Sequence, residues 1–304
     1  YNVEHPVFVK LLYAAGLRAA GHTGIPDQAE EPSARGFLQW YDDPPALGVY
    51  RIDRTISVLF GTLQVLVLTL TNPLSGLLLA IHTMTVKYTS EIYLEAVPAC
   101  AVTLSILAYE RARRRGQGRT GDWFWLSAGM LGLAAASKYV YIVPGLAMVP
   151  FILWQQRRRP WNALLYGLLA LAVFFALDPV LWPDLVGRLR ESVLYHSAYT
   201  ESAEVARYDY SWWQPLNWMS GAAVWHPGVF WFPFDFFVFL LSLIGLPFLF
   251  RWNRLYFAWF AVGWAFLFLW PTKWPQYTLI VTPAICLSAG GLVRAVARRY
   301  DLHL

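Results

Sequence analysis

Apolar blocks separated by short polar joints run through most of the chain. They are typical of membrane-crossing helices, although several are shorter than the roughly 20 residues that a helix needs to cross the hydrocarbon core. The tight joints at Asn72-Pro73 and Lys138 are therefore expected at partly buried helix ends. The pattern predicts an all-α polytopic membrane protein with about nine transmembrane helices. The predicted spans cover residues 55–71, 74–86, 92–109, 123–137, 139–154, 161–178, 229–250, 255–270 and 275–293.

Two long polar segments interrupt this pattern and divide the chain into four parts. Residues 1–54 are predicted as a first outer loop with a juxtamembrane helix, and residues 179–228 as a second outer loop with a surface helix. Residues 55–178 are predicted as one transmembrane bundle, and residues 229–304 as a second bundle with a cytoplasmic tail. Because the chain opens at Tyr1 within a polar loop, we expect it to be truncated at its N-terminus, with at least one span missing.

The composition agrees with a membrane protein and argues against other classes. Of the 304 residues, 57% are hydrophobic and only 14% are charged, whereas soluble domains carry about 25% charged residues. The net charge of +5 does not indicate a nucleic-acid partner, because the surplus lies in short arginine loops between the spans. The two cysteines, Cys100 and Cys286, lie in apolar stretches and offer neither a disulfide framework nor metal-ligand spacing.

Arginines and lysines separate to opposite ends of the predicted spans. If residues 1–54 lie outside and the spans alternate, the short inner loops receive the arginines, which is the orientation that the positive-inside rule favours. The outer face then carries both long loops, so we expect the function there. The inner arginines are Arg111, Arg113, Arg114, Arg115, Arg119, Arg157, Arg158, Arg159, Arg251, Arg254, Arg294, Arg298 and Arg299. The outer face receives all four lysines, namely Lys10, Lys87, Lys138 and Lys273.

The outer lysines are candidates for binding a phosphate at headgroup level, where an ammonium acts as a compact point charge. Lys87, Lys138 and Lys273 each lie where an apolar block meets the outer interface. The alternative is that each lysine is an anchor that snorkels to lipid headgroups beside Trp or Tyr. Their exclusive placement outside, against the positive-inside trend, favours a shared role.

For other polar residues near the outer face, the sequence allows either a structural role or a role in a functional site. Glu95 and Asp235 lie a turn or two inside spans, where an acid usually faces a polar cavity. A lone histidine such as His196 is more often structural than catalytic, while Trp225-His226 at a span entrance is placed to contact a substrate. The tryptophans and tyrosines of residues 208–225 fit an interfacial belt, and aromatic rings also stack on sugars.

Four short segments stand out at the outer ends of the spans, namely residues 4–12, Glu-His-Pro-Val-Phe-Val-Lys-Leu-Leu, residues 93–98, residues 136–139, and residues 272–277 with Pro283. They resemble motifs of membrane glycosyltransferases of the GT-C class, in the protein O-mannosyltransferase and aminoarabinose-transferase-like branch. The first is similar to that family's His-Pro-Pro-Leu-x-Lys segment in its first outer loop. Residues 93–98 are similar to its acid-containing motif that opens a span, and residues 136–139 to its Thr-Lys segment. Residues 272–277 with Pro283 resemble its late Lys-x-x-x-Tyr-x-x-x-x-x-Pro signature.

The resemblance implies transfer of one sugar from a polyprenyl-phosphate donor to an acceptor hydroxyl on the outer face. The acceptor is a lipid, a glycan or a protein, and the expected location is a bacterial inner membrane with the site on its periplasmic or extracellular face. The expected catalytic residues are Glu4, His5 and Glu95. The expected donor-phosphate ligands are Lys10, Lys87, Lys138, Lys273 and Tyr277, and the expected acceptor or sugar contacts are Trp225, His226 and Trp274.

Two departures from the family pattern bear on this expectation. Val7 replaces the usual second proline, and the acidic catalytic motif expected upstream of the His-Pro segment is not in the chain. The base is then either absent or supplied by Glu4. No metal ligands are evident, so we predict no cofactor, with a divalent metal as the alternative. The rival functions are a transporter or flippase of a lipid-linked substrate, which would favour inverted repeats, and a non-catalytic scaffold.

Overall fold

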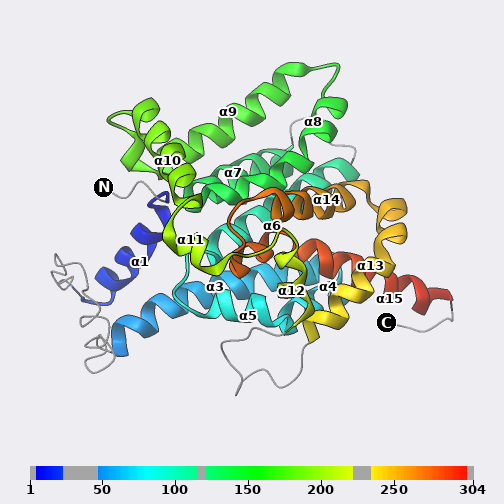
Figure 1. The fold of residues 1–304 in the computed structure, drawn as a ribbon. Coiled ribbons are helices and arrows are strands. Elements are labelled where there is room, and N and C mark those ends of the chain that lie inside the picture. Colours follow the sequence, from blue (N-terminus) through cyan, green and yellow to red (C-terminus); the bar gives the residue numbers. More distant parts are fainter. Residues whose placement is uncertain (1–4, 23–46, 116–120, 222–233, 300–304) are drawn as a thin grey trace.

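A computed structural model describes residues 5–22, 47–115, 121–221 and 234–299, and every regular element in these ranges is a helix (Figure 1). Those of the first half are α1 (Phe8–Ala19), α3 (Leu47–Thr71), α4 (Pro73–Ile81), α5 (Thr83–Ser90), α6 (Ala96–Arg114), α7 (Asp122–Ser137), η1 (Tyr139–Ala147), α8 (Val149–Gln155) and α9 (Pro160–Leu177). The second half forms η2 (Pro179–Leu181), α10 (Leu185–Thr200), α11 (Ala203–Tyr208), α12 (Gln214–Ser220), α13 (Phe234–Trp252), α14 (Arg254–Leu269), η3 (Pro275–Ile280) and α15 (Thr282–Arg299).

Helix α6 forms the centre of the core and is buried along most of its length. It packs between α7 and α3, and small side chains along it let these helices approach closely. Hydrogen bonds also join the helices, since the Ser105 hydroxyl donates to the Ser127 carbonyl at 2.8 Å and the Gln64 amide donates to the Thr103 hydroxyl at 3.0 Å. Such contacts matter between membrane helices because lipid supplies no hydrophobic driving force for their association.

Three helices are long and apolar enough to cross a membrane, namely Tyr50–Thr71, Pro160–Leu177 and Phe234–Trp252. Helices α14 and α15 contain shorter apolar stretches. The prediction of about nine continuous spans is not confirmed, because three of the expected blocks are interrupted. Residues 74–86 are divided between α4 and α5, residues 139–154 between η1 and α8, and residues 275–293 between η3 and α15.

The interruption between α4 and α5 has a specific cause. Asp235, at the start of α13, accepts hydrogen bonds from the Thr83 amide and hydroxyl, each at 2.7 Å, and from the Met84 amide at 3.2 Å. The carboxylate therefore caps the N-terminus of α5, where free amides and the helix dipole stabilise a negative charge. His82 lies in extended backbone at the break, with its Nδ1 3.4 Å from Asp235. Asp235 joins two helices here and does not line any of the cavities described below.

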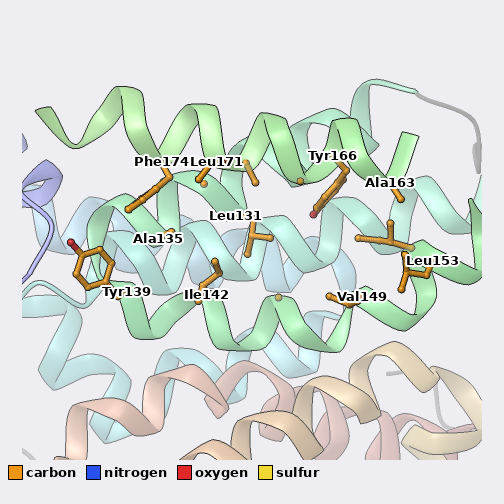
Figure 2. Close-up of a pocket in the computed structure, with 15 residues that line it drawn as sticks. Leu131, Ala135, Tyr139, Ile142, Val149, Leu153, Ala163, Tyr166, Leu171 and Phe174 are labelled. Atoms are coloured by element: carbon orange, nitrogen blue, oxygen red, sulfur yellow. The ribbon is translucent and has the colours of Figure 1, made fainter. Parts of the chain in front are cut away.

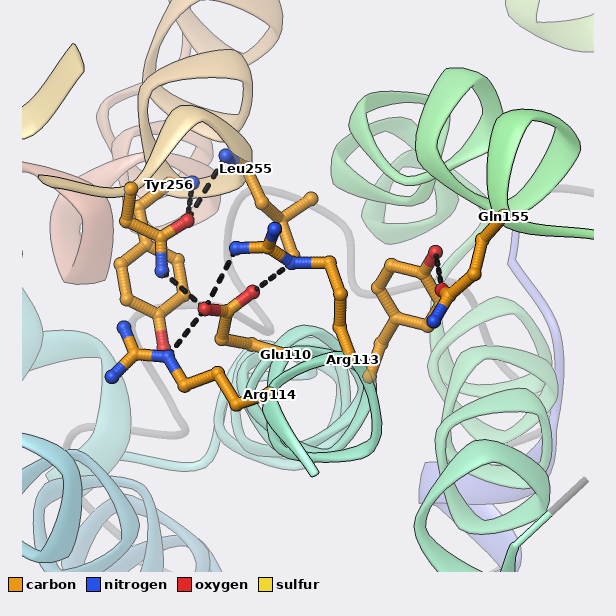
Figure 3. Close-up of polar contacts among 8 residues, drawn as sticks. Glu110, Arg113, Arg114, Gln155, Leu255 and Tyr256 are labelled. Carbon is orange, nitrogen blue, oxygen red and sulfur yellow. Dashed lines mark hydrogen bonds and ion pairs between the residues drawn. The ribbon is translucent and has the colours of Figure 1, made fainter. Parts of the chain in front are cut away.

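A second buried carboxylate joins the opposite ends of the helices. Glu110 of α6 accepts hydrogen bonds from Arg113, Arg114 and Asn253 (Figure 3). The Asn253 side-chain oxygen in turn accepts from the first backbone amides of α14. The network fixes the end of α6 against the joint between α13 and α14.

The two ends of the molecule differ in character. One end carries α1, α10 and α11, and we refer to it as the loop end (Figure 1). The other end carries the last turns of α6, α13 and α15, and we refer to it as the arginine end after Arg113, Arg251 and Arg294.

Candidate functional site

A polar cavity of about 240 Å³ lies at the loop end. Its walls come from four parts of the chain: the segment before α1, the joint between α7 and η1, the helices α10 and α11, and the segment from α14 to η3. Residues far apart in sequence therefore meet there. The lining residues are His5, Lys138, His196, Tyr199, Thr200, Glu204, Trp270, Thr272, Trp274, Gln276 and Tyr277.

Lys138 lines this cavity with its charged side chain, and the backbone geometry places it there. It ends α7 in an extended conformation, with φ −163° and ψ 120°, before η1 begins at Tyr139. Its ammonium donates a hydrogen bond to Glu95, and the two side chains are only 6% and 1% exposed. The Tyr277 ring centroid lies 5.4 Å from the Lys138 Nζ. A buried ammonium at a cavity wall, held by one carboxylate and an aromatic face, is placed to meet an anionic ligand.

Two histidines lie at a second side of the same cavity. The ring centroids of His5 and His196 are 5.8 Å apart, and His196 also contacts the Tyr139 ring at 6.5 Å. His196 comes from α10, whose N-terminus is capped by the Asp184 carboxylate accepting from the Gly187 amide at 2.9 Å. Imidazoles in this position can donate hydrogen bonds to a phosphate.

Aromatic side chains form a third side, beside η3. The Trp274 ring lies 5.3 Å from Tyr208 and 6.1 Å from Tyr210, in both cases edge to face. The Trp218 indole donates to the Lys273 carbonyl at 2.8 Å, which fixes the backbone before η3. Part of the predicted aromatic cluster is thus built into the wall next to the cavity.

Lys273 does not point into the cavity. Its ammonium donates to the carbonyls of Leu267 at 2.9 Å and Phe268 at 2.8 Å, and also to the carbonyl of Trp270. These three bonds use all three of its N–H donors and satisfy carbonyls left open at the end of α14. Burial lowers the pKa of this ammonium. The predicted role of Lys273 in donor binding stays a prediction, and the geometry gives it a structural role.

The other predicted lysines lie outside the cavity lining. Lys87 is buried in the last turn of α5, with its Nζ 5.6 Å from the Tyr88 ring centroid. Burial lowers the Lys87 pKa, and the charge of Glu91 opposes that shift. Lys10 lies in the first turn of α1. The predicted residues Glu4, Trp225 and His226 lie outside the described residues.

Several cavity residues were not among the predicted site residues. His196, Tyr199 and Thr200 share one face of α10, and Glu204 follows on α11. A spacing of three to four residues on a surface helix is the signal that could have grouped His196 with Thr200. Thr272 and Gln276 belong to the late motif and were not given roles. Within the described ranges, no group of three or more His, Cys, Asp or Glu is arranged to hold a metal ion.

An apolar groove of about 490 Å³ begins beside the polar cavity. It runs between α9 and the η1–α8 segment, with α7 as its floor (Figure 2). Tyr139 and Phe174 flank one end, and Leu153 and Ala163 lie at the other (Figure 2). Since Tyr139 also contacts His196 of the cavity lining, the groove and the cavity are neighbours. Together they offer a polar pocket and a long apolar channel.

Comparisons with known proteins bear on this arrangement. The sequence model of a family described as dolichyl-phosphate-mannose-protein mannosyltransferase matches residues 54–182. No curated protein matches the chain significantly. Among solved structures, the chain is similar to the crystal structure of ArnT from Cupriavidus metallidurans bound to undecaprenyl phosphate, with 17% identity and a TM-score of 0.61. The similarity covers 98% of this chain and 51% of that chain, so this chain spans about half the length of that protein.

These matches confirm the resemblance to the protein O-mannosyltransferase and aminoarabinose-transferase-like branch of the GT-C class. The likeness to the solved structure shows the fold. The apolar helices and the family match together indicate an integral membrane protein.

The pairing of Lys138 with Glu95 predicts how substitutions affect stability. Glu95→Ala removes the carboxylate that accepts from the buried Lys138 ammonium, so we expect it to lower the free energy of unfolding by about 3–5 kcal/mol. Thermal unfolding in detergent measures this loss. The double variant Glu95→Leu with Lys138→Met removes both charges and keeps side-chain volume, so it should recover most of the stability. An unfolding temperature for Glu95→Ala equal to that of the parent protein would contradict a structural pairing.

Proposed function

We propose that this protein transfers a single sugar from a polyprenyl-phosphate donor to an acceptor hydroxyl in the loop-end cavity. The observation that carries the proposal is the Lys138 ammonium at the wall of a polar cavity that adjoins an apolar groove. A lipid-linked sugar has the same two parts, an anionic head and a long apolar tail. The family match and the undecaprenyl phosphate of the structural neighbour support this donor class.

The reaction needs charge stabilisation at the donor phosphate. The glycosidic bond between the sugar carbon and the phosphate oxygen breaks, and the phosphate leaves with the electron pair. Lys138, with His5 and His196 nearby, lies where it can hold this growing negative charge. Such stabilisation in a site shielded from water is usually the largest catalytic contribution.

The acceptor hydroxyl must lose its proton as its oxygen bonds to the sugar. Among the described residues that line the cavity, the only carboxylate is that of Glu204. We assign it the role of general base, which takes this proton. Glu95 is paired with Lys138, so its role is to position the ammonium. Glu4 stays a predicted alternative for the base.

The groove accommodates the first isoprene units of the donor tail. Its walls are almost wholly apolar, and it runs from Tyr139, beside the cavity, to Leu153 and Ala163 (Figure 2). The tail leaves lipid and not water, so packing contacts with the groove walls, and not a hydrophobic driving force, would supply the binding energy that fixes the phosphate beside Lys138.

We place the loop end on the outer face of the membrane. The arginine end carries Arg113, Arg114 and the exposed Arg251 next to candidate spans. Arginine-rich ends of this kind face the cytoplasm by the positive-inside rule. In a bacterial cell the cavity would then open to the periplasmic or extracellular side, where the acceptor is a lipid, a glycan or a protein.

A paired substitution tests the role of Lys138 apart from its structural pairing. The double variant Glu95→Leu with Lys138→Met should stay folded and yet lose at least about 100-fold in kcat, because no ammonium remains at the phosphate. Transfer of radiolabelled sugar from a lipid-linked donor by protein in vesicles measures the rate. Near-parental turnover by the folded double variant would remove Lys138 from the site.

The base assignment predicts a change in the pH profile. Glu204→Gln should lower kcat about 100-fold or more and remove the acidic limb of the rate profile, since the proton acceptor is gone. Glu201→Gln is the matched control, because Glu201 is exposed, close in sequence and not part of the cavity lining. If the two variants retain the same rate and the same profile, the base is another group.

The groove predicts a dependence on tail length. Gly167 lines the groove, and a Cβ added there meets nothing within 4 Å, so Gly167→Phe introduces a ring beside the groove from a position with free space. We expect its KM to rise about tenfold or more for a long-chain donor, equivalent to about 1.4 kcal/mol, and to stay near parental for a two-isoprene donor. Gly129→Phe is the control, since Gly129 has the same free space and lies outside the groove. Equal effects on both donors would place the tail elsewhere.

A further inference from the structure

A third cavity, of about 350 Å³, lies at the arginine end, far along the helices from the candidate site. It is formed where the α3–α4 joint, the last turn of α13 and the last turns of α15 meet. Its lining combines two arginines, Arg251 and Arg294, with a buried amide, Asn72, and with the rings of Phe248 and Trp252. Neither the proposed transfer nor the motifs of the sequence use these residues.

The two arginines line the cavity with their charged side chains. Arg113 and Arg114, at the same end, are paired with the Glu110 carboxylate. Within the part of the chain that the structure describes, neither Arg251 nor Arg294 forms an ion pair with an acid. Both side chains are exposed. Two uncompensated guanidinium groups on one cavity favour an anionic ligand, and a phosphate suits their planar, forked donors.

Asn72 adds a donor at the buried side of this cavity. The residue is 1% exposed, and its Oδ1 caps α4 by accepting from the Ser75 amide at 3.3 Å. Its Nδ2 is buried and has no hydrogen-bond partner among the described residues. A buried amide N–H left without an acceptor is costly, and an anion in the cavity would supply the acceptor. The N-terminus of α4 begins at the next residue and adds a positive dipole end.

The apolar part of the lining indicates where the anion comes from. Phe248 is 45% exposed and Trp252 is 41% exposed, both on the end of a helix long and apolar enough to cross a membrane. Such rings at a membrane interface contact the upper part of acyl chains. A free phosphate would not use them, whereas a phospholipid would contact the arginines through its headgroup and the rings through its chains.

We infer that this cavity binds the headgroup of an anionic phospholipid from the leaflet at the arginine end. Arg251 and Arg294 hold the phosphate, and Asn72 donates to it from the buried side. The cavity joins α4, α13 and α15. The bound lipid would therefore hold together α13, which carries Asp235, and α15, which follows η3. The inference concerns lipid binding and stability, so it stands or falls independently of sugar transfer.

Lipid binding to the purified protein tests the site. In native mass spectrometry with phosphatidylglycerol, Arg251→Gln with Arg294→Gln should weaken binding roughly tenfold or more, because the variant loses the two guanidinium groups that line the cavity and can form forked hydrogen bonds to the headgroup phosphate. Arg158→Gln with Arg159→Gln is the control, since it removes the same charge from exposed positions at the same end that do not line the cavity. We expect the control pair to bind as the parent does.

A second variant and a second probe complete the test. Asn72→Asp keeps the oxygen that caps α4 and places a carboxylate against the phosphate, so it should also weaken phosphatidylglycerol binding, with the protein still folded by circular dichroism. Inorganic phosphate and phosphatidylcholine serve as the other probes, and neither should raise the unfolding temperature as phosphatidylglycerol does. The inference is overturned if the control pair loses as much binding as the cavity pair, if the cavity variants bind normally, or if phosphate alone reproduces the stabilisation.

Discussion

The loop-end site depends on one interaction, the buried pairing of Lys138 with Glu95. An ammonium removed from water needs a countercharge, and here the two partners come from the facing ends of α7 and α6, which pack closely along the core. The pairing therefore serves two purposes. It joins α6 and α7 at the loop end of the helix bundle, and it holds a cation at the wall of the cavity. A ligand anion would share that cation with the Glu95 carboxylate.

The candidate site lies where helices are interrupted. Lys138 lies between α7 and η1, and Tyr277 belongs to η3, a short 3-10 segment between α14 and α15. Irregular backbone at membrane depth is tolerated only where protein buries it or where it lines a cavity. Each break needs partners for the open backbone groups at the helix ends. The Lys273 ammonium supplies them at the end of α14, and the Asp235 carboxylate at the start of α5.

Position along a span is enough to predict at which end of the bundle a residue lies. His5, Lys138, Trp274 and Tyr277 were predicted as site residues, and all four line one cavity, while their roles stay predictions. The direction of a long side chain is not set by its position, so nothing in the pattern showed that Lys273 turns back to the carbonyls of its own helix. Nor does a hydropathy pattern reveal that a carboxylate on a distant helix divides an apolar block at His82. Which residues of α10 line the cavity depends on how that helix packs against the bundle, and the sequence of α10 alone does not determine this packing.

Helix α9 is bound to the rest of the protein along one side and is otherwise largely uncovered, with only 11% of its apolar stretch buried. If α9 faces lipid as proposed, a donor tail would reach the groove beneath it sideways, from within the bilayer. A molecule arriving by this route diffuses in two dimensions, and its encounter rate follows its density per unit of leaflet area. Turnover would then respond to dilution by other lipids and to the fluidity of the acyl chains, while adding bulk water to the vesicles would leave it unchanged.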